Sequence, residues 1–324
     1  MKKLISVMLT ALMIVPLFAG CGAKADDGVI NIAIIQQLDH SSLDEIRLAA
    51  QAEIDRIAAE KGVKVEYKHF NGQNDTSVLA QIGTQVVSDG YDLILPIATL
   101  AAQYAVTAAE GKNIPIVYAA VSDPETAGLT GMSHVPGVSD ALNTPFIMDM
   151  MFAADPDIQT VGLLYSLSEP NSEKPIKEAK AYLDAKGIPY VEKTGNTADE
   201  VITAATALVG RCEAVFTPTD NAIMNVAPAV AEILANAGIA HYTGADSFVQ
   251  AGSFTTCGVN YTELGTYTAA MAMDIALGGA VPNFHVMDGG IITVNTGTAS
   301  ALGLDYSVFN AMANTVLAIS TVVD

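Results

Sequence analysis

The chain has 324 residues, of which 51% are hydrophobic and 15% charged, a composition typical of a folded protein with room for about two domains. It has 15 Lys and Arg residues and 35 Asp and Glu residues, so the formal net charge is −20 at pH 7. This charge excludes nucleic acid as a partner, because binding to a phosphate backbone requires a basic surface. It also excludes attachment to anionic lipid through the general surface charge.

The first residues have the pattern of an export signal. Two lysines precede an apolar run over residues 4–18, and small residues and Cys21 follow it. Because the run is shorter than the roughly 20 residues of a membrane-spanning helix, we expect residues 1–20 to be a cleaved signal peptide. The four residues that end at Cys21 resemble the bacterial lipobox, which implies lipid modification of Cys21 and a tether over residues 21–28.

Two further cysteines, Cys212 and Cys257, lie at the edges of apolar, strand-like runs. An exported protein can form a disulfide from such a pair, but buried free thiols also behave as small hydrophobic residues, and the sequence leaves both possibilities open. No CxxC motif or His/Cys cluster indicates a metal site, and we expect no cofactor.

Short β-branched runs alternate with helical patterns from residue 29 onward. The helix expected from Ser42 begins with a capping-box pattern, in which Ser42 and Glu45 would satisfy the first backbone N–H groups. Such alternation predicts a parallel sheet covered by helices on both faces. The first series comprises strands at 29–35, 63–69, 93–98 and 114–121, with helices at 42–61, 77–88 and 101–110.

A second series of similar size follows a loop over residues 122–140. It comprises helices at 144–153, 173–186, 198–209 and 222–237, with strands at 160–166, 189–193, 214–218, 240–243 and 253–259. A late helix at 263–277, a strand at 291–294 and an apolar helix or strand within 311–323 complete the chain.

The two series predict an α/β fold with two doubly wound parallel-sheet lobes, joined by a hinge of several chain crossings. Lobe 1 is expected to contain residues 29–138 and about 260–283, and lobe 2 residues 139–259 and about 284–324.

Ligands of parallel sheets bind beyond the carboxyl ends of the strands, so polar residues that follow each strand are candidate ligand-binding residues. For each of them the alternative is simple capping of the next helix. The candidates are Gln36, His40, Thr99, Ser122 and Asp123 in lobe 1, and Tyr165, Ser166, Glu169, Asn171, Ser172, Thr219, Asp220, Asn221 and Asp246 in lobe 2.

Several of these strand ends lie in longer motifs that resemble one known family, the substrate-binding lipoproteins of ABC transporters. The resemblance implies a type I periplasmic-binding-protein fold and a free amino acid as ligand, chiefly tryptophan, tyrosine or phenylalanine. The motifs are Ile34-Ile35-Gln36 with His40 and Leu43-Asp44, residues 92–99, 114–124, 137–140 and 162–172, Pro218-Thr219-Asp220-Asn221, and residues 258–261 with 263–265.

A free amino acid is a zwitterion, so its site must supply donors for the carboxylate and an acidic partner for the ammonium group. Asp220 or Asp123 is the expected ammonium partner, and Glu169 is a second candidate. Gln36, His40 and Tyr165 are expected to line the space for the side chain. The expected carboxylate donors are Thr99, Ser166, Asn171 and Ser172.

The resemblance also implies partners and location: an ABC permease with its ATPase, a lipid anchor at the extracytoplasmic face of the membrane, and a monomer. A ligand-sensing lipoprotein, or a binding protein for a nucleoside or sugar, is the alternative. An enzyme is disfavoured, because the sequence contains no HExxH, GxSxG, P-loop or GxGxxG motif, and a Ser/His/Asp triad would have to assemble from separate loops.

Overall fold

The computed structural model describes residues 28–321. The predicted signal peptide, Cys21 and all but the last residue of the tether lie outside this range. Between residues 28 and 321, none of the helices combines the length and apolar character needed to cross a bilayer.

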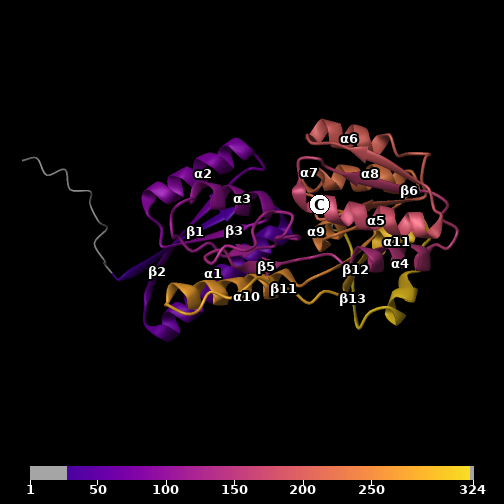
Figure 1. Ribbon diagram of the computed structural model, residues 1–324. Helices are drawn as coiled ribbons and strands as arrows, with labels where there is room; N and C mark the ends of the chain where they lie inside the picture. The colour runs from indigo at the N-terminus through magenta and orange to yellow at the C-terminus, as the bar shows by residue number, and fades with distance from the viewer. Residues whose placement is uncertain (1–27, 322–324) are drawn as a thin grey trace, which may run out of the picture.

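The first lobe is built on a parallel sheet with the strand order β11-β5-β4-β3-β1-β2 (Figure 1). Its strands are β1 (Val29–Gln36), β2 (Lys64–Asn71), β3 (Leu93–Ile97), β4 (Tyr118–Ala119), β5 (Gly137–Ser139) and β11 (His285–Val286). The helices that cover it are α1 (Ser41–Lys61), α2 (Thr76–Asp89), α3 (Thr99–Ala108) and α10 (Tyr261–Ala276).

Strand β1 shows why this sheet requires helices on both faces. Its side chains alternate between two apolar clusters, because successive residues of a strand point to opposite faces. Ile32 and Ile34 belong to the cluster that contains Ile46 of α1, whereas Ala33 and Ile35 belong to a cluster on the other face. This arrangement is the doubly wound fold that the sequence predicts.

The second lobe contains a larger sheet, ordered β13-β12-β10-β9-β8-β6-β7, in which β10 and β12 form the antiparallel pair. Its strands are β6 (Val161–Tyr165), β7 (Tyr190–Thr194), β8 (Ala214–Thr217), β9 (Ala240–Thr243), β10 (Thr255–Gly258), β12 (Ile291–Asn295) and β13 (Thr315–Ile319). Its helices are α4 (Thr144–Ala154), α5 (Glu173–Lys186), α6 (Ala198–Thr206), α7 (Asn221–Met224), α8 (Ala227–Asn236), α9 (Asp246–Gln250) and α11 (Thr296–Leu302).

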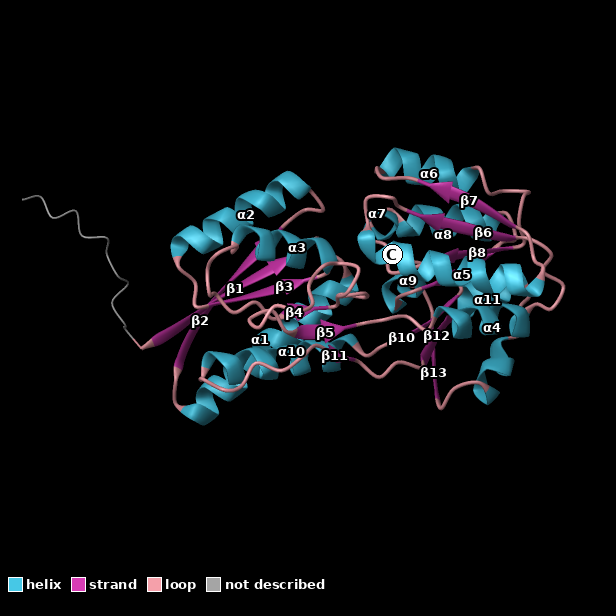
Figure 2. Cartoon of the chain, in the orientation of Figure 1, coloured by secondary structure: helices cyan, strands magenta, loops and turns pink. Residues whose placement is uncertain are grey.

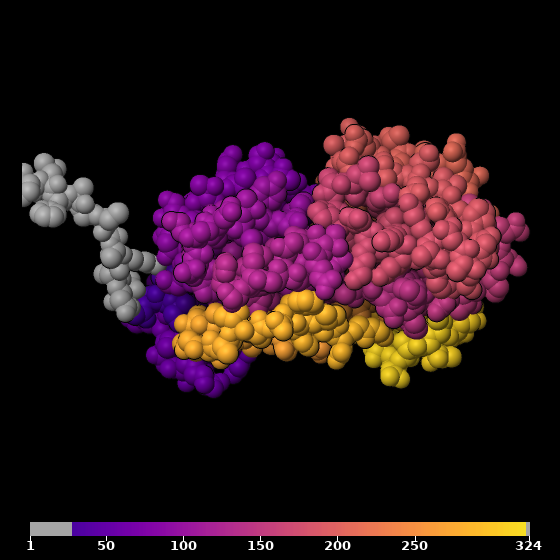
Figure 3. Space-filling model, in the orientation of Figure 1, coloured from indigo at the N-terminus to yellow at the C-terminus, as the bar shows by residue number. Residues whose placement is uncertain are grey.

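Within residues 28–321 the chain passes between the lobes three times, after β5, after β10 and after β11. Figure 3 shows the segment around α10, in orange, running along the first lobe toward the second. Strand β11 pairs with β5 in the first sheet, whereas the expected boundary assigned residues from 284 onward to lobe 2. Ser139, the last residue of β5, belongs to the first sheet for the same reason.

The predicted capping box of α1 is wrong. His40 is the N-cap residue and makes no side-chain cap. Ser42 Oγ instead donates to Asp246 Oδ1 at 3.0 Å, and Glu45 Oε1 accepts from the Thr262 N–H at 3.0 Å. Both side chains are therefore used in contacts with distant parts of the chain.

Cys212 and Cys257 form no disulfide with each other: both are free and buried. They lie in different apolar clusters. Burial raises the pKa of each thiol to about 11, which makes both unreactive near neutral pH.

Candidate functional site

A pocket lies between the lobes, where the carboxyl ends of strands from both sheets meet. Figure 2 shows α7 and α9 on the side of the second lobe that faces the first. Lobe 1 and the first two crossings contribute His40, Ser42, Leu43, Ala98, Thr99, Ala120, Ser122, Asp140 and Tyr261 to its lining. Lobe 2 contributes Asn171, Thr219, Asp220, Asn221, Met224, Ala245, Ser247 and Phe248.

Two helices of the first lobe begin at the pocket. Helix α1 begins directly after His40, and α3 begins at Thr99. The first N–H groups of a helix lack partners within the helix and carry partial positive charge, so these ends favour an anionic group.

Two alanines of the lining have an unusual backbone conformation. Ala98 and Ala120, which follow β3 and β4, have φ values of 77° and 53°. Positive φ is sparsely populated by residues other than glycine, and such strain is concentrated at functional sites. Both strained residues directly follow a strand and line the pocket.

On the second lobe, Asp220 holds the loop that connects β8 to α7. Its Oδ1 accepts the Ile223 N–H at 3.1 Å, and its Oδ2 accepts from Ser166 N and Ser172 Oγ, each at 2.7 Å. Gly244 lets the neighbouring loop approach, because a Cβ at this position would lie 2.6 Å from the Thr219 nitrogen.

The lining is acidic and, among the residues that the structure describes, contains no Lys or Arg. Asp140 and Asp220 both line the pocket, and burial raises the pKa of each. His40 is neutral near pH 7, because burial lowers its pKa to about 4. The pocket is therefore suited to a ligand with a cationic group.

A buried polar network connects the lobes behind the lining. Glu169 Oε1 accepts from Gln37 Nε2 of lobe 1 at 2.9 Å, and Glu169 Oε2 accepts from Asn221 Nδ2 at 3.0 Å. Burial, and next the charge of Asp220, raise the pKa of Glu169 to about 8. Gln37 Oε1 accepts the Leu100 N–H at 3.1 Å, which ties this network to the first turn of α3.

Other contacts also join the lobes directly. Ser122 Oγ lies 3.1 Å from Thr219 Oγ1, and Ser42 of lobe 1 bonds to Asp246 of lobe 2. The largest apolar cluster includes residues of both lobes, such as Leu43 and Phe248. The structure is therefore that of a closed protein.

The pocket brings together seven of the fourteen predicted site residues: His40, Thr99, Ser122, Asn171, Thr219, Asp220 and Asn221. Others lie behind the lining. Ser166 and Ser172 bond to Asp220, Glu169 forms the network, and Asp246 bonds to Ser42.

Three predicted residues point elsewhere. The Gln36 amide is held by Leu38, Asp44 and Arg47 within lobe 1. Tyr165 donates to Glu192 at 2.8 Å. Asp123 accepts from Thr126 Oγ1 at 2.7 Å and lies 3.9 Å from Lys174 Nζ.

Several lining residues were absent from the predicted set. Asp140 follows β5, and the three residues of this strand are too few to show a period of two. Ser247 and Phe248 lie directly after Asp246, so the loop was identified but not the residues that face the pocket. The apolar part of the lining, which includes Met224 and Tyr261, gives no signal in the sequence that distinguishes it from core.

Comparisons with known proteins agree with this architecture. The family model for ABC transporter substrate binding proteins matches residues 31–313. A tyrosine-binding protein of Clostridioides difficile (strain R20291) is 28% identical over 322 residues, which cover 94% of this chain and 93% of that protein.

Two solved structures are also similar. An ABC domain in complex with L-Trp from Streptococcus pneumonia is 28% identical, with a TM-score of 0.82 over 89% of this chain and 99% of that one. The ligand-free, open structure of a substrate-binding protein with adhesive properties from Clostridium difficile is 30% identical, with a TM-score of 0.68 over 90% of this chain and 100% of that one.

The fold, with two parallel-sheet lobes and three crossings, is that of type I periplasmic binding proteins, as the sequence predicts. With a family model that matches nearly the whole described chain, the protein belongs to the ABC transporter substrate binding protein family.

Proposed function

We propose that this protein captures a free aromatic amino acid between its lobes and delivers it to an ABC permease with its ATPase. The observation that carries the proposal is the pocket itself, in which both lobes supply polar side chains around one acidic, partly apolar space. The relatives named for tyrosine and L-Trp support the class of ligand.

The acidic side of the pocket fits the ammonium group. Asp220 supplies the charge, although its oxygens already accept bonds from the protein. Asn171 supplies the open position: its Nδ2 bonds to the Thr219 carbonyl at 2.5 Å, which leaves Asn171 Oδ1 buried and without a partner. A carbonyl can only accept, so the amide nitrogen must face it and Oδ1 must be the free acceptor. Asn171 thus suits the ammonium group and not the carboxylate.

The ligand carboxylate requires donors, which lobe 1 provides. The Thr99 hydroxyl lines the pocket, and helices α1 and α3 begin beside it. The hydroxyl proton of Ser122 is already donated to Asp140 Oδ1 at 2.9 Å. Unpaired burial of a carboxylate is costly, so this set of donors is the condition for closure around a zwitterion.

Closure follows from the division of these groups between lobes. A ligand that touches both lobes stabilises the closed state over the open one, because each lobe alone offers only part of the contacts. The extracytoplasmic location and the lipid anchor at Cys21 belong to the same proposal and rest on the signal and lipobox patterns of the sequence.

The test is a binding screen of the purified mature domain by thermal shift and calorimetry, with the twenty amino acids, nucleosides and small sugars as ligands. We expect 1:1 binding of at least one aromatic amino acid. A response to a nucleoside or sugar alone would refute the proposed ligand class and leave the family assignment intact.

A further inference from the structure

His40 presents a hydrogen-bond acceptor to the pocket. Its Nε2 lies 3.3 Å from Asn221 Oδ1, while Asn221 Nδ2 donates to Glu169. While Glu169 is ionised and accepts from Asn221 Nδ2, Asn221 Oδ1 faces the imidazole and can only accept, so the proton of the imidazole must be on Nε2. His40 is neutral, so its Nδ1 carries a lone pair and no proton.

This Nδ1 atom is buried and has no hydrogen-bond partner. Among the residues that the structure describes, three side-chain atoms of the pocket lining are buried without a hydrogen-bond partner: His40 Nδ1, Asn171 Oδ1 and Ser247 Oγ. A buried acceptor without a donor costs about 1–3 kcal/mol, so a ligand that brings a donor to Nδ1 recovers this free energy.

Apolar side chains of the pocket lining lie on the elements that hold His40, although the ring also lies near Asn221 and the carboxylates of Asp39 and Asp44. Leu43 follows His40 by three positions at the start of α1, and Met224 follows Asn221 by three positions on α7. Asn221 and Met224 are neighbours on the surface of α7, and Leu43 lies in the first turn after His40, whose backbone is extended. Leu43 and Met224 both line the pocket. His40 therefore belongs to the apolar side of the pocket, where the ligand ring is expected, while Asn171 and Asp220 serve the ammonium group.

We propose that His40 Nδ1 accepts a hydrogen bond from the side chain of the ligand, and that the protein thereby selects aromatic amino acids whose ring carries a donor. An indole N–H or a phenol O–H satisfies this condition, and the ring of phenylalanine does not. The inference rests on the proposed function and specifies its ligand more closely.

The first experiment uses the unmodified protein and five ligands: Trp, Tyr, Phe, 1-methyl-Trp and O-methyl-Tyr. We expect the preferred ligand, Trp or Tyr, to bind roughly 5- to 150-fold more tightly than both Phe and its own methylated analogue, which lacks the donor. Equal affinity for Phe and for the preferred ligand would overturn the inference while leaving the proposed function in place. Absence of binding by any aromatic amino acid would instead refute the proposed function.

The second experiment tests whether His40 is the acceptor. The comparison with Phe, which carries no added methyl group, excludes a purely steric effect. In His40→Ala the affinity penalty for methylation should disappear, because the acceptor is gone and space is created. Ser247→Ala is the matched control, since Ser247 is the other unpartnered group beside apolar lining residues, and it should keep the penalty. A penalty that persists in His40→Ala, or that disappears in Ser247→Ala alone, would contradict the assignment to His40. If His40 instead contacted the ammonium group, His40→Ala would weaken Trp, Tyr and Phe equally.

Discussion

Asp220 has two roles at the scale of single residues. It accepts hydrogen bonds from the loop after β6 and from the first turn of α7, and it lines the pocket. The position of Asp220 directly after a strand predicts a binding role, and a residue with that role alone could be replaced by alanine with little loss of folding stability. The structure changes this expectation, because alanine would leave several buried donors unpaired, at about 1–3 kcal/mol for each donor.

Asp220→Asn is the sharper test, because it keeps the size of the side chain and removes the charge. We expect ligand affinity to fall roughly 10- to 100-fold, since a hydrogen bond to a charged group contributes about 1.5–3 kcal/mol. Calorimetric titration measures this change, and thermal unfolding monitors the fold.

Asp123→Asn is the matched control for this substitution, since Asp123 was an equal candidate in the sequence but does not line the pocket. Its affinity should stay near that of the unmodified protein. A larger loss in Asp123→Asn than in Asp220→Asn would contradict the geometry of the site.

The comparison of Asp123 with Asp220 shows what sequence can predict at this scale. Both follow a strand and precede a turn or helix, so both satisfy the rule that places ligands at carboxyl ends of strands. Which side chain turns inward depends on local partners: Thr126 and Lys174 hold Asp123, whereas Ser166 and Ser172 hold Asp220 at the pocket. Thr126 is local to Asp123, but Lys174, Ser166 and Ser172 come from other segments, and the local pattern carries no information about them.

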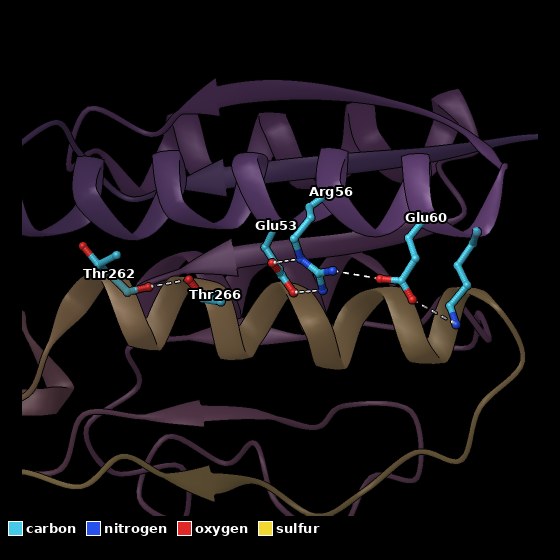
Figure 4. A network of polar contacts seen from close by, with 6 residues as sticks. Glu53, Arg56, Glu60, Thr262 and Thr266 are labelled. Atoms are coloured by element: carbon cyan, nitrogen blue, oxygen red, sulfur yellow. Dashed lines mark hydrogen bonds and ion pairs between the residues drawn. The ribbon is translucent and has the colours of Figure 1, made fainter.

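At the scale of elements, the pair of helices α1 and α10 joins the first lobe to the hinge. Figure 4 shows the two helices side by side, with Arg56 of α1 bonded to Glu53 and Glu60 on the solvent side. These exposed ion pairs contribute little to stability. The close approach of the helices depends instead on Gly265, where a Cβ would lie 2.4 Å from the Ile46 carbonyl oxygen.

Gly265→Ala should therefore destabilise the protein. Alanine ordinarily stabilises a helix relative to glycine by about 1 kcal/mol, but here the clash involves backbone and forces the helices apart. Because overpacking costs about 1–3 kcal/mol, we expect a net lower melting temperature and lower resistance to urea.

Thr266→Ala is the control, one residue further along α10. Within residues 28–321 its hydroxyl bonds to the Thr262 carbonyl of its own helix and to no other group, as Figure 4 shows for this bond, so stability should change by less than about 0.5 kcal/mol. A Gly265→Ala protein as stable as the unmodified chain would show that the helices can separate without cost.

Element type was predictable where periodic patterns were long. Helix α5 covers the predicted residues 173–186 and ends at Gly187, whose φ is 71°. The predicted helix 222–237 is instead two helices, because Pro228 lies in the first turn of α8 and cannot continue a helix from α7. The sequence pattern did not reveal β11, since a strand of two residues has no measurable alternation.

At the scale of the whole molecule, the two lobes were predictable but their closure was not. The βα alternation predicted both sheets, whereas contacts such as that between Gln37 and Glu169 join residues 132 positions apart. The TM-score is higher for the L-Trp complex than for the ligand-free, open relative, although the open relative is more similar in sequence. This difference supports the closed arrangement seen in the direct contacts between lobes.

Closure should depend on pH through Glu169. In the closed state its pKa is about 8, because of burial and the charge of Asp220, whereas opening breaks its bond to Gln37 and exposes it to water. The open-state pKa then falls toward the ordinary value of about 4.3, while the charge of Asp220 on the same lobe keeps it somewhat higher. Between these values the closed state holds a proton that the open state has released, so closure takes up a proton and weakens as pH rises toward 8. His40 has the opposite effect on closure. Burial lowers its pKa to about 4 in the closed state, so below its ordinary pKa of about 6.5 closure releases a proton from His40 and is weakened as pH falls.

The informative range is therefore roughly pH 7.5 to 8.5, where His40 is almost entirely neutral in both states and Glu169 titrates. We expect ligand affinity to fall across this range, by at most about tenfold per pH unit. Calorimetry in buffers of different ionisation enthalpy should show proton uptake on binding. In Glu169→Gln the fall in ligand affinity with pH and the proton uptake on binding should both be smaller, even if affinity is lower overall. Titration of the ligand itself affects both proteins equally. An affinity that rises with pH, or a decline that Glu169→Gln leaves unchanged, would exclude Glu169 as the proton-binding group of closure.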